Sequence, residues 1–133
     1  DAAQTVDRMA YPAITTLVVT ADNSNGYKFD QYGNTEDPVI YALNGTTIAF
    51  DLNDSSIGSH PFQIETSGGT QYNSGLVHVS TAGVVSTGVN AQGQTSGTLY
   101  WKIPQSISGN YAYQCTSHGA MRGTITIKQI SAI

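Results

Sequence analysis

The sequence has few charged residues and no long apolar run. Asp, Glu, Lys and Arg together make up 11% of its 133 residues, and only five of these are Lys or Arg, against nine Asp or Glu. The net charge of −4 leaves no basic stripe to meet phosphates, so we expect no nucleic-acid partner. No apolar segment approaches the length that crosses a bilayer, so we also expect no membrane span.

Cysteine is nearly absent as well. Cys115 is the only one, which excludes an internal disulfide. The chain begins at Asp1 and not at Met, and we interpret this as the mature end of an exported protein, periplasmic or extracellular. A spare thiol is reactive in an oxidising compartment, so we expect something to occupy Cys115.

Helix-favouring stretches of Ala, Leu, Glu and Lys are missing too. Fourteen Gly and eight Tyr accompany many short β-branched segments that polar turns separate. This pattern predicts an all-β fold, a Greek-key β-sandwich of seven to nine strands. We interpret residues 1–12 as an N-terminal arm and residues 13–133 as one domain. The segments with strand character, some of them weak, are 14–20, 27–32, 38–43, 46–52, 60–66, 76–79, 84–89, 97–104, 110–115 and 123–130. Between two of them, Asn44-Gly45 predicts a two-residue hairpin turn.

The most informative motif lies near the C-terminus. Cys115, His118 and Met121 fall at i, i+3 and i+6 in a tight loop between two strand-like segments. Sulfur ligands combined with imidazole select copper, and a type 1 site needs two His, one Cys and a weak axial Met. His60 is the natural second histidine, at the start of a strand whose Phe62 and Ile64 face the core. We expect it to tie the loop to the opposite sheet.

These residues resemble those of a known family. The short Cys-x₂-His-x₂-Met loop is similar to that of the cupredoxins, above all the amicyanins, and Tyr-x-Tyr before Gln114-Cys115 matches them as well. His60-Pro-Phe also looks like plastocyanin-like domains, and the resemblance covers roughly residues 40–130. It implies one type 1 copper held by His60, Cys115, His118 and Met121. It further implies one-electron transfer and no enzymatic activity, with a redox protein partner docking near His118.

Two positions depart from the family pattern, and one of them is Ser117, where amicyanin-type loops often carry proline. The residue after the first His ligand normally donates its backbone N–H to the cysteine sulfur, but Pro61 has no N–H to donate. Hydrogen bonds to the sulfur tune the metal, so Pro61 predicts a lower potential.

Other candidate residues have simpler interpretations. His78 is the rival remote ligand, and its Gly- and Ser-bounded segment places it at the surface. Asp51, Asn53 and Asp54 lack the full calcium-ligand spacing and are typical of a turn. Trp101 and the tyrosines are expected to be core and strand-pair residues and not a binding platform. No nucleophile motif, carboxylate pair or phosphate-binding glycine loop suggests an enzyme.

A second function stays open at this point. Low charge, abundant Ser, Thr and Asn, and the unassigned arm 1–12 also suit a structural or assembly module of a virion, filament or cell surface. Such an arm would build a homo-oligomer by pairing with the sheet edge of a neighbouring subunit.

Overall fold

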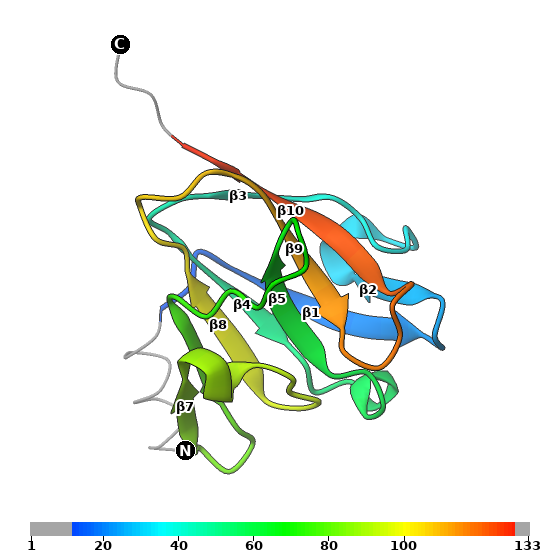
Figure 1. Ribbon diagram of the computed structural model, residues 1–133. Helices are drawn as coiled ribbons and strands as arrows, with labels where there is room; N and C mark the ends of the chain where they lie inside the picture. The colour runs from blue at the N-terminus through cyan, green and yellow to red at the C-terminus, as the bar shows by residue number, and fades with distance from the viewer. Residues whose placement is uncertain (1–11, 130–133) are drawn as a thin grey trace.

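The computed structural model describes residues 12–129 (Figure 1). Within this range the chain forms ten β-strands and three short 3₁₀ helices, and no α-helix. The 3₁₀ helices are η1 (Asp30–Tyr32), η2 (Ser55–Ile57) and η3 (Gly88–Ala91). The strands are β1 (Thr15–Asp22), β2 (Gly26–Phe29), β3 (Ile40–Leu43), β4 (Thr47–Asp51), β5 (Phe62–Thr66), β6 (Leu76–Val79), β7 (Val85–Thr87), β8 (Thr98–Lys102), β9 (Gly109–Cys115) and β10 (Arg122–Lys128).

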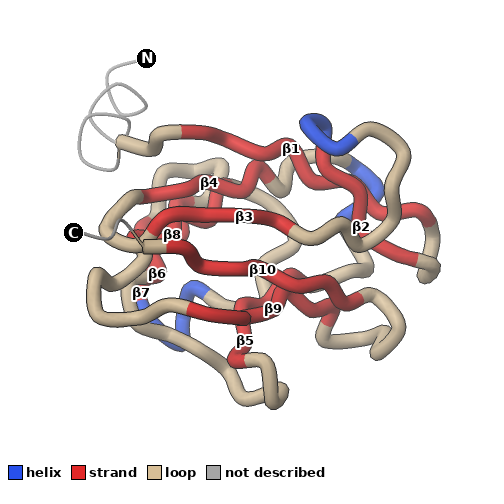
Figure 2. Tube along the Cα trace, turned by 90° about the horizontal axis from the view of Figure 1, so that it is seen from above, coloured by secondary structure: helices blue, strands red, loops and turns tan. Residues whose placement is uncertain are grey.

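The strands form two sheets that pack face to face, as in a Greek-key β-sandwich. One sheet has six strands in the order β2-β1-β4-β8-β6-β7, and the other has four in the order β3-β10-β9-β5. Most neighbours are antiparallel, but β1 pairs parallel with β4 and β10 pairs parallel with β3. Figure 2 shows β3 and β10 running side by side. The predicted all-β sandwich is confirmed.

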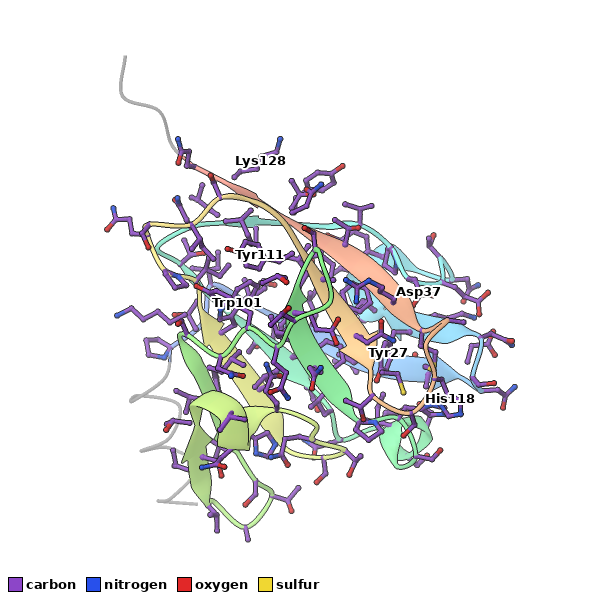
Figure 3. The ribbon with its side chains drawn as sticks, in the orientation of Figure 1. Tyr27, Asp37, Trp101, Tyr111, His118 and Lys128 are labelled. Atoms are coloured by element: carbon purple, nitrogen blue, oxygen red, sulfur yellow. The ribbon has the colours of Figure 1, made fainter. Side chains whose placement is uncertain are left out.

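Residues of alternating polarity direct one face of each sheet into the core. In β10, Gly123, Ile125 and Ile127 are buried, whereas Thr124 and Thr126 between them are partly exposed. This is the two-residue period of a half-buried strand. Large aromatic residues fill the space between the sheets, often edge to face, and the expected core position of Trp101 is confirmed. Figure 3 shows Trp101 and Tyr111 together in one half of this core.

The strand count exceeds the seven to nine that we predicted. All ten segments with strand character form strands, including the weak ones, because pairing with a neighbour stabilises even short segments. The shortest, β7, has three residues and pairs only with β6. The last strand ends at Lys128. Of the predicted arm, residues 1–11 lie outside the described part of the chain.

The predicted hairpin at Asn44-Gly45 is wrong. These residues join β3 to β4, which belong to different sheets. Gly45 adopts φ 77°, whereas Asn44 is not among the residues with positive φ, so the pair lacks the geometry of the predicted type I′ turn. The amide of Asn44 donates to Lys128 O at 2.9 Å and that of Gly45 to Ile103 O at 2.8 Å. The chain therefore crosses between the sheets here, and the hydrogen bonds to Lys128 and Ile103, which are distant in sequence, stabilise this crossing.

Within residues 12–129, no helix has the length and apolar character that a bilayer crossing requires.

Candidate metal centre

The loop between β9 and β10 is a compact turn closed by its own backbone. Cys115 is the last residue of β9, and its N–H donates to Met121 O at 2.9 Å. The N–H of Met121 donates in turn to His118 O at 3.1 Å. These two bonds draw the three loop residues of the motif into one short segment at one end of the sandwich.

His60 reaches this end of the sandwich from the connection between β4 and β5. Asp54 caps η2 by accepting from Ser56 N at 3.0 Å, and the N–H of His60 then donates to Ile57 O at 2.8 Å. Two residues later Phe62 begins β5, fully buried. Since β5 pairs with β9, His60 precedes a strand of the same sheet as Cys115, and our expectation that it comes from the opposite sheet is wrong.

The structure brings together three of the four predicted ligands. The Sγ of Cys115 lies 3.6 Å from His118 Nδ1 and 3.8 Å from His60 Nδ1. The two imidazole rings are 4.8 Å apart between centroids, and the three possible ligand atoms all lie within 4.8 Å of one another. His60 and Cys115 are buried and His118 is partly exposed. Figure 3 shows His118 on the loop, at the same end as Tyr27.

Met121, the fourth predicted ligand, ends this loop. It is fully buried and belongs to the hydrophobic core cluster. Its carbonyl accepts from Cys115, so its backbone lies directly beside the cysteine. The role of Met121 as a fourth ligand remains a prediction.

The three clustered donors fit copper better than a hard cation. A thiol and two imidazole nitrogens converge, and no carboxylate belongs to the group. These donor types match the His₂Cys set of a type 1 site, whereas Ca²⁺ and Mg²⁺ require oxygen ligands. Burial, and to a lesser degree the neighbouring His118, lower the pKa of His60 below its ordinary value. The lowered pKa favours the neutral imidazole, which has a lone pair to offer a metal.

Tyr27 of β2 supports this site, and sequence reasoning did not single it out. Its hydroxyl is buried and donates to His60 O at 2.7 Å, with Pro61 O at 3.2 Å. Burial, and then the nearby Cys115, raise the pKa of Tyr27 far above its usual range. A strand position alone carries no signal for this contact, because it depends on how β2 packs against the β4–β5 connection.

Two alternative ligand interpretations can now be judged. The prediction that His78 lies at the surface is wrong: its side chain is buried, with Nε2 2.7 Å from Ser96 O, and it is not one of the three clustered residues. The turn interpretation of Asp51 and Asp54 is confirmed. Asp51 accepts from Asn53 N at 2.9 Å, and Asp54 accepts from the backbone and hydroxyl of Ser56.

Solved structures share this architecture. A crystal structure of a rusticyanin mutant is 21% identical and covers 89% of this chain and 80% of its own, with a TM-score of 0.50. The chain has a cupredoxin fold. Auracyanin B matches with 19% identity over 87% of this chain and 90% of its own, at a TM-score of 0.49. A reduced amicyanin mutant matches with 17% identity over 90% and 88%, at a TM-score of 0.44. No protein-family description and no curated protein sequence matches this cupredoxin-fold chain.

Proposed function

We propose that this protein is a mononuclear type 1 copper protein that carries one electron at a time. The observation that carries the proposal is the convergence of Cys115 Sγ with His60 Nδ1 and His118 Nδ1 at 3.8 and 3.6 Å inside a cupredoxin fold. Met121 is the proposed fourth ligand. When bound, copper would supply a centre that alternates between Cu(I) and Cu(II).

The protein's contribution is to hold its ligands in place. His60 is held through its own N–H and through its carbonyl, which accepts from Tyr27. Cys115 is paired on both sides, with Phe62 of β5 opposite it and its N–H on Met121 O. Ligands held by a rigid surrounding shell need little rearrangement when the charge of the metal changes.

His118 is the proposed exit for the electron. It is the one clustered donor that is partly exposed, and the next residues, Gly119 and Ala120, are exposed, small and uncharged. We expect a redox protein to dock on this patch through a small transient interface. We further propose that the protein is exported.

The test is a visible absorption and EPR spectrum of the oxidised protein after one equivalent of Cu(II) is added. We expect an intense thiolate-to-copper band that is absent from Cys115→Ser. His118→Gly should alter the band and slow electron exchange with a redox partner. A colourless protein that leaves copper in solution would exclude the proposal.

The alternative, an assembly module, depends on the arm 1–12, of which residues 1–11 lie outside the described range. Molecular mass in solution, measured with and without residues 1–11, separates the two functions. An oligomer that becomes monomeric on deletion would support assembly, and a monomer in both cases would support a soluble carrier.

A further inference from the structure

The side chain of Gln114 lies against the inside of the loop that carries Cys115 and His118. Its Nε2 is within hydrogen-bond distance of four loop carbonyls. The oxygens lie at 2.9 Å (Cys115), 3.1 Å (His118), 3.3 Å (Gly119) and 3.1 Å (Met121). An amide NH₂ has two protons, so these four acceptors share them. One side chain thus contacts most of the loop, including the backbone of three proposed ligands, Cys115, His118 and Met121.

The orientation of this amide is determined by Arg122. Nη1 of Arg122 lies 3.1 Å from Oε1 of Gln114. A guanidinium can only donate, so the atom facing it must be the amide oxygen, and the NH₂ group must face the loop. Had the amide been reversed, two donors would meet at Arg122 and an oxygen would face four carbonyls. Both ends of Gln114 therefore support the same orientation.

Arg122 is itself anchored on a third strand. Its Nη1 forms an ion pair with Glu65 of β5, a carboxylate whose side chain is 7% exposed. Its Nη2 donates to Thr66 O at 3.3 Å and to Ser67 O at 3.1 Å. Gln114 of β9 is directly opposite Arg122 of β10 in register, so the contacts run straight across the sheet. They form a continuous polar path from β5 to the loop.

We infer that Glu65, Arg122 and Gln114 act as a loop brace, which sets the spacing between the proposed ligands Cys115 and His118. The inference rests on the proposed copper site and names the residues that position it. Four carbonyl oxygens gathered around one point repel one another unless a donor lies between them. Without the amide of Gln114, the loop would relieve this repulsion by rotating its peptide groups, and the cysteine–histidine spacing would change with them. Gln114 is thus a positioning residue that touches only the ligands' backbone.

The first measurement needs no copper. In the metal-free protein, the amides of Cys115 and Met121 are hydrogen-bonded to loop carbonyls that Gln114 also contacts. We expect Gln114→Leu, which is close in size but cannot hydrogen-bond, to speed their hydrogen exchange about tenfold or more. The matched control is Gln63→Leu, because Gln63 faces Gln114 across β5 and β9 but bonds Gln71 and Oε2 of Glu65. Arg122 pairs with the other oxygen, Oε1, so this change leaves the contacts of the brace itself in place. Exchange of the two amides in this control should stay within about twofold of wild type.

The second measurement uses the copper-loaded protein. We expect Gln114→Leu to change the position of the thiolate band and the copper hyperfine splitting in EPR, while Gln63→Leu retains both. Arg122→Gln removes the ion pair with Glu65. It should speed amide exchange and shift the thiolate band in the same direction as Gln114→Leu does. The double variant Gln114→Leu/Arg122→Gln should exceed neither single variant by more than about twofold in exchange, because both break one connection.

The outcomes separate the brace from the copper assignment. If the wild type binds no copper but Gln114→Leu still accelerates exchange, the copper function fails and the brace holds. If the wild type shows the copper band while exchange and spectra of Gln114→Leu match those of wild type, the brace is overturned. Equal acceleration in Gln63→Leu would also overturn it, because the effect would then belong to the sheet surface and not to the loop contact.

Discussion

Two regions of this protein each contain a buried histidine, and they differ in what faces the ring. His60 is 6% exposed and His78 is 2% exposed, and burial lowers the pKa of both. The ring of His78 is satisfied by the carbonyl of Ser96 at 2.7 Å. The ring of His60 faces the sulfur of Cys115 and the ring of His118. Burial alone therefore does not distinguish the two histidines; of the two, only His60 converges with other possible metal donors.

The surroundings explain the difference. His78 lies in β6 opposite Leu99 of β8, and its ring occupies space that Gly97 leaves open. A Cβ at Gly97 would lie 2.7 Å from His78 Nε2. His60 lies outside any strand, where the β4–β5 connection meets the loop after β9. A side chain inside a strand, such as that of His78, packs against the neighbouring strands. A histidine where loops meet, such as His60, can direct its ring toward another loop.

The largest expected effect is a difference in copper binding between variants of His60 and His78. His60→Ala removes a proposed ligand and should abolish the thiolate band, lowering copper affinity by more than about a hundredfold. His78→Ala should keep the band and lose stability by about 2–4 kcal/mol, since a buried ring and its hydrogen bond are removed. Copper titration followed by absorbance, together with urea unfolding, measures both. A lost band in a folded His78→Ala would reverse the assignment.

The next effect concerns Gly97, whose missing side chain leaves space for the ring of His78. Gly97→Ala combines φ +74° with a Cβ placed 2.5 Å from Val79 O, so we expect a loss of about 3 kcal/mol or more. Gly93→Ala is the matched control: its φ is +69°, but nothing lies within 4 Å of the new Cβ. It should lose only about 1 kcal/mol, from the backbone conformation. Urea unfolding of the metal-free variants decides, and equal losses would show that His78 is not confined by Gly97.

A third effect is pH dependence in the metal-free protein. Because burial lowers the pKa of His78, the unfolded chain takes up its proton at a higher pH than the folded one. Stability is therefore full above pH 6.5 and is lost as the pH falls below it, at up to about 1.4 kcal/mol per pH unit for this one proton. His60 adds to the loss in the same direction. His78→Gln should reduce the slope of unfolding free energy against pH between pH 7 and 5, measured by urea unfolding. An unchanged slope would contradict the prediction.

The smallest effect compares two buried tyrosines that each donate to a carbonyl. Tyr27 donates to His60 O at 2.7 Å and Tyr113 to Pro38 O at 2.6 Å. Tyr27→Phe and Tyr113→Phe should each lose about 1 kcal/mol of unfolding free energy. Only Tyr27→Phe should also shift the copper band, because only Tyr27 holds the backbone of a proposed ligand. A shift in Tyr113→Phe of the same size would contradict this distinction.

Part of the candidate site was predictable because it is local. Cys115, His118 and Met121 lie within seven residues, so any turn that reverses the chain there keeps them together. The buried positions of Phe62 and Ile64 followed from two-residue alternation, and the structure confirms them. The predicted arm 1–12 and the oligomer built through it remain predictions.

Contacts between segments that are distant in sequence could not be predicted. Asn44-Gly45 has the composition of a hairpin, but pairing with Lys128 and Ile103 makes it a crossing between sheets. Likewise, nothing in the immediate sequence of Gln114 indicates that Arg122 will determine its orientation.

The sequence by itself therefore determined the all-β class, the spacing of the proposed loop ligands and the low content of charged residues. The tertiary structure decided that His60 and not His78 faces Cys115, that Tyr27 holds the backbone of His60, and that Glu65 reaches the loop through Arg122. The physical reason is range: alternation and turn preference act over a few residues along the chain. Strand pairing and packing select among many possible neighbours, and only the folded chain brings those neighbours together.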